Sequence, residues 1–277
     1  MCSAGPRSAW WPRVANPYTS LARAQWRSFA SYRTSFVVDL LSNVGGTALD
    51  VVAVLVLFQA TRTVAGFSLS EGLLIVSLSS LAFALADFSV GNVDRLKTYV
   101  RTGLLDAVLV RPLGALPQLL LMDLPIRKAL RLVVGVVVLA VALHVNDIEW
   151  TPARVALIVI APLAGSVFFG AIFVISASVT FWWIDSGDLG SAFTYGGRDF
   201  TAYPVPVYSG WFRALFAYAM GFGFVAYQPA VTLLGRDDPL GLPAWTGFVS
   251  PLVALIAAAA AALMWRAGIR HYRSTGS

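Results

Sequence analysis

Six long apolar stretches dominate this sequence and decide what it can fold into. They fall near residues 36–59, 72–90, 127–145, 155–181, 208–227 and 247–265. A helix needs roughly 20 residues to cross about 30 Å of hydrocarbon, so each stretch is long enough to span a bilayer. Because 58% of the residues are hydrophobic and only 12% are charged, the composition falls outside that of soluble domains. The sequence therefore predicts an all-α polytopic membrane protein with six transmembrane helices.

The lysines and arginines are divided unevenly between the two faces of this predicted bundle. Of the 20, all except Arg62, Arg154 and Arg236 fall on one face, and the 182–213 connection, with Arg198 and Arg213, is counted there. Loops rich in Lys and Arg remain in the cytoplasm, so we expect this face, and with it both termini, to be cytoplasmic. The placement also accounts for the net charge of +6. We therefore expect a lipid bilayer, and no nucleic acid, around the chain.

Residues 17–35 predict an amphipathic helix ahead of the first span. The apolar side chains of this segment share one side of a helical wheel, while Arg23 and Arg27 point the other way. A helix divided in this way lies flat in the membrane interface. It is either an elbow that braces the bundle or a simple anchor for the terminus. No linker or repeat divides the chain, so residues 1–277 are expected to form a single transmembrane domain.

The residue types needed for catalysis or metal binding are sparse. Cys2 is the only cysteine, and the two histidines, His144 and His271, are far apart. His144 with Asp147 and Glu149 could hold a metal weakly, but such residues in a short loop are more often solvated. Neither lysine follows a glycine, as a phosphate-binding P-loop requires, and no G-x-S-x-G motif is present. The sequence thus predicts no enzyme and no cofactor in this chain.

The segment 91–113, between the second and third spans, is too long for a simple turn. Five apolar residues can share one face of a helix in it: Leu96, Tyr99, Val100, Leu104 and Val108. Pro112 is expected to end that helix. An amphipathic helix facing the cytoplasm suits the groove of a soluble partner. The alternative is an interfacial helix whose arginines reach toward water.

Two further regions combine polar or flexible residues with membrane depth. In the first span a polar stripe recurs every three or four residues: Asp39, Asn43, Gly46, Thr47 and Asp50. A carboxylate at this depth costs at least about 2.5 kcal/mol unless it faces a cavity or partner. The stripe indicates a translocation path or subunit interface, or else ordinary hydrogen bonding between helices. After the fifth span, residues 228–243 are broken by prolines and glycines, which indicates short outer-face helices or a plain exposed loop.

Two segments of the sequence resemble the membrane permeases of bacterial type 2 ATP-binding-cassette (ABC) exporters, in their six-span branch. The stretch "YVRTGLLDAVLVRPL" (99–113) resembles the cytoplasmic segment of that branch, and "YPVPVYSGWFRALFAYAMGFGFVAYQPAVTLLG" (203–235) resembles its fifth-span region. The branch often has a proline in the middle of the fifth span, where this chain reads "MGFGF". Its glycines are expected to supply the same bend.

The resemblance implies a permease subunit of an ATP-driven exporter in the bacterial inner (plasma) membrane. It implies two ABC ATPase subunits that bind Mg-ATP, a second permease that is identical or homologous, and a coupling helix in the 91–113 loop. The residues expected to couple to the ATPase are Tyr99, Arg101, Gly103, Leu105, Asp106, Arg111 and Pro112. Those expected at the translocation path or subunit interface are Asp39, Asn43, Asp50, Gly221 and Gly223. The alternative function is a proton-coupled secondary transporter that uses Asp39 and Asp50.

Overall fold

The computed structural model describes residues 63–122 and 126–273, together with positions 45, 52 and 56. Apart from one antiparallel bridge between Val64 and Phe67, all regular elements in these residues are helices. The all-α class is therefore confirmed for the described part. The predicted elbow at 17–35 and nearly all of the first span at 36–59 lie outside the described residues.

The described helices follow one another with short connections. The longer ones are α3 (Leu69–Ser89), α7 (Ile126–Val145), α8 (Pro152–Ser178), α9 (Gly187–Thr201) and α12 (Ser250–His271). The shorter ones are η1 (Gly91–Arg95), α4 (Leu96–Arg101), α5 (Leu104–Leu109), α6 (Ala115–Leu121), η2 (Val179–Phe181), η3 (Ile184–Ser186), η4 (Val205–Val207), α10 (Gly210–Arg213), the π-helix η5 (Ala214–Ala219), η6 (Phe222–Phe224), α11 (Tyr227–Leu234) and η7 (Ala244–Val249).

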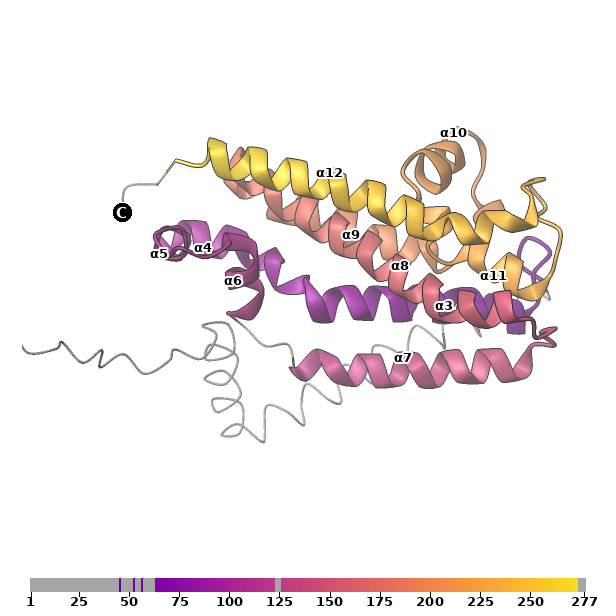
Figure 1. The fold of residues 1–277 in the computed structure, drawn as a ribbon. Helices are drawn as coiled ribbons and strands as arrows, with labels where there is room; N and C mark the ends of the chain where they lie inside the picture. Colours follow the sequence, from indigo (N-terminus) through magenta and orange to yellow (C-terminus); the bar gives the residue numbers. More distant parts are fainter. Residues whose placement is uncertain (1–44, 46–51, 53–55, 57–62, 123–125, 274–277) are drawn as a thin grey trace, which may run out of the picture.

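Among the described residues, four helical segments are long and apolar enough to cross a membrane, and a bent pair adds a fifth. The four contain α3, α7, α8 and α12, at the positions predicted for the second, third, fourth and sixth spans. They lie side by side along one axis (Figure 1). The α3 and α8 helices are the central ones, because 67% and 61% of their apolar stretches are buried, whereas 17% of that of α7 is.

The α3 helix can occupy the centre because its sequence is apolar on all sides, a pattern typical of a helix surrounded by others. It begins with a capping box, in which the Glu71 carboxylate accepts from the Ser68 N–H at 2.7 Å and the Ser68 hydroxyl accepts from the Glu71 N–H. This exchange satisfies two donors at the start of the helix. Asn146, just after α7, donates to the Ser70 carbonyl at 2.8 Å and ties the two helices together.

The α9 helix is a departure from the sequence prediction, which counts the 182–213 connection on the basic face. Instead, α9 packs along α8, where Thr194 donates to the Ser176 hydroxyl at 3.2 Å. It ends beside the middle of α3, where the hydroxyls of Thr201 and Ser79 are 2.6 Å apart. The Arg198 guanidinium lies 5.5 Å from the ring centroid of Phe83 in α3. The expected loop position of this arginine is therefore wrong.

The predicted fifth span, 208–227, is not one straight helix. Two helical segments, Gly210–Ala219 and Phe222–Leu234, pass the length and hydropathy test only as a pair, and they are bent by 61°. The bend contains Gly221 with φ +90, a conformation that glycine adopts at little steric cost. A Cβ at Gly221 would lie 2.5 Å from the Val253 side chain of α12. The chain thus bends in the "MGFGF" stretch, where its glycines led us to expect a bend.

Phe222, directly after the bend, is fully buried between α8, α9 and η5. Its ring contacts those of Phe168, Phe200 and Phe216 at centroid distances of 5.1 to 6.3 Å. Gly197 leaves room for this ring, because a Cβ there would lie 2.5 Å from Phe222 Cε1. Close packing around small residues is how helices associate in lipid, and here it holds α9 in the bundle.

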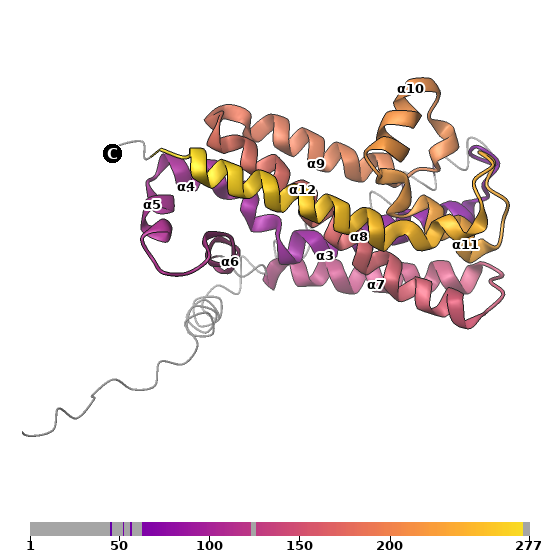
Figure 2. The same cartoon turned by 45° about the horizontal axis from the view of Figure 1, so that its top comes forward.

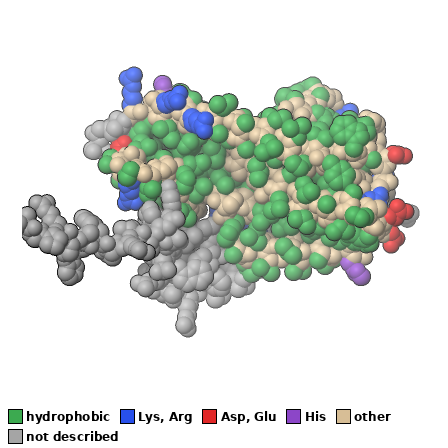
Figure 3. Space-filling model, viewed as in Figure 1, with side chains coloured by type: hydrophobic (Ala, Val, Ile, Leu, Met, Phe, Trp, Pro, Cys, Tyr) green, Lys and Arg blue, Asp and Glu red, His purple; other side chains and the backbone are tan. Residues whose placement is uncertain are grey.

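Charged side chains gather at the two ends of the bundle. Figure 3 shows blue side chains at the end near the start of α7 and red ones at the opposite end. We call these the basic end, with Lys97, Arg101 and Arg111, and the acidic end, with Glu149 and Asp237. Figure 2 shows α9 along one side of the bundle and α7 along the other. Arg213 was expected on the basic face, but it lines a hollow with Leu240 and Leu242 near the acidic end.

Two adjacent glycines in α9 test the packing of this helix. Gly197→Ala places a methyl group against Phe222, so we expect the free energy of unfolding to fall by about 1–3 kcal/mol. A Cβ at Gly196 meets nothing within 4 Å, so Gly196→Ala is expected to leave stability unchanged or raise it by about 0.5–1 kcal/mol. Thermal unfolding of the purified chain in detergent measures both. Equal melting temperatures for the two variants would show that α9 does not pack as described.

Candidate functional site

The segment that leaves α3 at the basic end forms two short helices, α4 and α5, and not the single helix expected. They are separated at Gly103, which has φ +71, a left-handed conformation that favours glycine. The break changes which residues share the inner face. Leu105 and Val108 are fully buried, but Leu104, expected on that face, is 46% exposed. In α4, Leu96, Tyr99 and Val100 are buried as well. Of the five apolar residues predicted to share one face, only Leu104 is therefore exposed.

At the end of α5 the chain forms an exposed turn, which we call the tip: Leu109, Val110, Arg111 and Pro112. Val110 is 85% exposed, an unusual state for a large apolar side chain outside the spans. Hydrogen bonds from Gln118 of α6 nevertheless hold the residues on both sides of the tip. The Gln118 amide is buried and donates to the carbonyls of Val108 at 3.3 Å and Leu113 at 3.1 Å. An apolar side chain is thus held outward on a fixed turn.

Side chains from other parts of the bundle brace the α4–α5 unit. The Arg101 guanidinium donates to the Asp185 carboxylate of η3, and Lys97 lies 3.5 Å from the same carboxylate. The Tyr272 hydroxyl, directly after α12, donates to Asp106 Oδ1 at 3.1 Å. Exposed ion pairs of this kind add little stability. They do, however, connect the tip to the start of α9 and to the end of α12.

Three residues of this site were not predicted from the sequence: Asp185, Tyr272 and Gln118. Asp185 and Tyr272 are distant from 99–113 in the sequence, and Gln118 follows shortly after that segment. No motif includes any of the three. The coupling residues that were predicted lie together at the basic end. Arg101 and Asp106 face the braces, Gly103 forms the break, Leu105 is buried beneath, and Arg111 and Pro112 belong to the tip.

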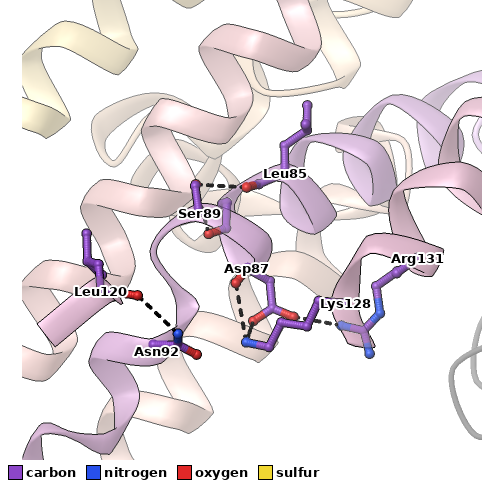
Figure 4. A network of polar contacts seen from close by, with 8 residues as sticks. Leu85, Asp87, Ser89, Asn92, Leu120, Lys128 and Arg131 are labelled. Atoms are coloured by element: carbon purple, nitrogen blue, oxygen red, sulfur yellow. Dashed lines mark hydrogen bonds and ion pairs between the residues drawn. The ribbon is translucent and has the colours of Figure 1, made fainter. Parts of the chain in front are cut away.

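A second polar network lies where α3 meets α7 (Figure 4). Lys128 Nζ lies 2.5 Å from Asp87 Oδ1, and Arg131 lies 3.0 Å from the other carboxylate oxygen. Asp87 is 4% exposed. In the following turn, the Asn92 amide donates to the Leu120 carbonyl of α6 at 3.3 Å. Burial raises the pKa of the neighbouring Asp94 carboxyl to about 6. The network fixes the base of the segment that carries the tip.

The residues named for a translocation path are only partly placed. Asp39, Asn43 and Asp50 lie outside the described residues. Gly221 and Gly223 lie at the bend of the fifth span, where a Cβ at Gly223 would be 3.0 Å from the Ala217 carbonyl oxygen. Within the described ranges, no three His, Cys, Asp or Glu side chains group closely enough to hold a metal ion.

The Asp87 network provides a test of stability. Asp87→Asn leaves Lys128 and Arg131 without their shared carboxylate, so we expect the free energy of unfolding to fall by about 2 kcal/mol or more. The matched control is Asp185→Asn, which also removes a carboxylate from two cations but at a site where its side chain is 64% exposed. That change is expected to cost less than about 1 kcal/mol. Thermal unfolding with equal losses for both variants would contradict the assignment of Asp87 as a buried anchor.

Comparisons with known proteins and protein families bear on the identity of the chain. No curated protein and no solved structure matches the chain. The family model described as "ABC-2 family transporter protein" matches residues 44–276, which is most of the sequence. This family consists of transmembrane subunits that carry no catalytic site of their own. With its helices of membrane-spanning length, the chain belongs to the ABC-2 family of transporter membrane proteins.

Proposed function

We propose that this chain is the permease subunit of an ATP-driven exporter and that its tip docks on a separate ABC ATPase. The observation that carries the proposal is an exposed apolar turn, Leu109 to Pro112, held in a fixed position at the basic end. Rigid presentation of an apolar anchor lowers the entropic cost of binding. Arg111 in the same turn adds a positive charge for an acidic rim on the partner. Family membership supports an ATPase partner.

The charge distribution supports the orientation that this docking needs. Lys and Arg mark the cytoplasmic side of membrane proteins, so the basic end faces the cytoplasm in this proposal. The α4–α5 unit then lies in the compartment that supplies Mg-ATP to the partner subunit. Both termini are cytoplasmic, and the membrane is the bacterial inner membrane. The cation-poor acidic end faces outward.

The braces of the α4–α5 unit suggest how ATP binding reaches the membrane spans. Two ATPase subunits close around ATP and displace the tips of two permeases, identical or homologous. The Asp106–Tyr272 hydrogen bond conveys this movement to α12, and the contacts of Asp185 convey it to α9. From α9 the chain continues into the bent pair around Gly221. Tighter nucleotide binding by the closed state supplies the free energy.

In this proposal the two permeases share one translocation path. Asp39, Asn43 and Asp50 from the first span line the path or the interface between subunits, together with the bend at Gly221 and Gly223. A carboxylate at membrane depth is stable only beside such a cavity or partner. A bend in a spanning helix supports the same assignment, because irregular backbone at membrane depth occurs where protein or water satisfies it.

Docking through the tip is tested by adding a charge at its most exposed residue. The tagged full-length chain is purified from its host membrane, and any co-purifying polypeptide with a P-loop and Mg-dependent ATPase activity is quantified by mass spectrometry. Val110→Asp is expected to reduce recovery of that ATPase by about tenfold or more, because a desolvated apolar anchor carries much of an interface's energy. The matched control is Val145→Asp, at the opposite end, where the valine is 51% exposed. It is expected to retain the ATPase.

Two results would contradict the proposal. Equal ATPase recovery with both aspartate variants would show that the tip does not dock. Absence of any such ATPase from the unaltered chain, combined with transport that ignores ATP and stops with an uncoupler, would favour the proton-coupled alternative through Asp39 and Asp50.

A further inference from the structure

A lateral groove of about 380 Å³ opens beside α12 in the half of the bundle nearer the basic end. This volume lies in the range of small-molecule sites in proteins, about 300 to 1,000 Å³. The groove runs between α12 and α8 and reaches the end of α3 and the α6 helix. Small residues on α8 and α12 leave the space open: Gly170, Ala171, Ala258, Ala261 and Ala262.

The interior of the groove offers almost nothing to a polar ligand. Its two hydroxyl groups are already bonded to their own helices, since Ser89 donates to the Leu85 carbonyl at 2.8 Å and Ser166 to the Leu163 carbonyl at 2.7 Å. The other lining side chains are hydrocarbon except Trp265 and Arg266, which are adjacent in α12 toward the basic end. The surface beside the groove is lipid-facing in character, with Val167 46% exposed and Leu263 66% exposed. A hydrocarbon chain fits such a groove without leaving a polar group unpaired.

The basic end of the groove carries positive charge that the described residues do not neutralise. Arg266 lines this end, and Arg270 lies one turn further along the same face of α12. Both arginines are exposed, and neither forms a hydrogen bond or ion pair within the part of the chain that the structure describes. Figure 3 shows blue side chains gathered over this end of α12, next to the apolar surface. Basic pockets between spans attract anionic lipid head groups.

We propose that this groove binds an anionic phospholipid, with an acyl chain along α12 and the phosphate against Arg266 and Arg270. A protein helix is a poor occupant. A helix about 10 Å wide fills roughly 380 Å³ in about 5 Å of its length, less than one turn. A single acyl chain is thinner and flexible. The bound lipid would come from the leaflet at the basic end and would support α12 close to Tyr272, the residue that braces the α4–α5 unit.

The test is native mass spectrometry of the purified full-length chain. The chain is released from micelles that contain equal amounts of phosphatidylglycerol and phosphatidylcholine. We expect the unaltered chain to retain phosphatidylglycerol preferentially. Ala258→Phe fills the groove, and Arg266→Gln with Arg270→Gln removes the charges. Each change is expected to reduce phosphatidylglycerol retention by roughly tenfold.

Matched controls lie on the same helix. Ala260→Phe adds the same ring on the opposite face, because residues two apart on a helix do not share a face. Arg273→Gln removes an arginine beyond the end of α12. Both are expected to retain lipid as the unaltered chain does. If Ala258→Phe fails to fold, Ala262→Leu provides a smaller filler at an exposed position that lines the groove.

Three results would overturn the proposal. Equal retention of the two lipids by the unaltered chain would remove the anionic preference. Loss of retention with the arginine changes but not with either filler would mean that phosphate meets exposed arginines and no chain enters the groove. Loss of a dimer with Ala258→Phe, while lipid retention stays unchanged, would assign the groove to a second copy of the chain.

Discussion

The ion pairs of Asp87 are the interaction on which the basic end of this protein depends. A buried carboxylate is costly unless cations neutralise it, and here Lys128 and Arg131 at the start of α7 do so at the end of α3. The two helices therefore meet at a fixed point. The segment between them, which carries α4, α5 and the tip, starts and ends near this anchor. Asn92 and Gln118 then hold its path through carbonyl contacts, so that an exposed turn keeps a defined shape.

The sequence predicted the straight spans well because their signal is local. The α3, α7, α8 and α12 helices lie in continuous apolar runs, and lipid leaves such runs no alternative to a helix. The signal for α9 is of another kind. Its sequence "GDLGSAFTYGGRDFT" contains three charged residues and four glycines. Such a composition is typical of a loop and does not predict a helix packed in a membrane bundle. Its position depends on tertiary contacts, namely the Phe222 ring over Gly197 and the Thr201–Ser79 hydrogen bond. No local pattern shows these contacts.

In the candidate site, too, the local features were predicted from the sequence and the tertiary contacts were not. Resemblance to ABC exporter permeases identified the 99–113 stretch, and all except Leu104 of the five apolar residues predicted to share one helix face are buried. The break at Gly103 moved Leu104 to the surface and brought Leu105 inward, because a left-handed residue resets the register of the second helix. Asp185 and Tyr272 joined the site from distant positions. Those contacts are also what gives the tip a physical connection to α9 and α12.

The central claim is that the basic end, with the tip, lies in the compartment that contains ATP. Cys2 is the only cysteine, so Cys2→Ser with Val110→Cys gives one reporter at the tip, and Cys2→Ser with Glu149→Cys gives one at the acidic end. A membrane-impermeant maleimide is applied to intact cells and to inside-out vesicles. Labelling at position 110 only in inside-out vesicles, and at position 149 only in intact cells, is the result this account predicts. Labelling at position 110 in intact cells would contradict it.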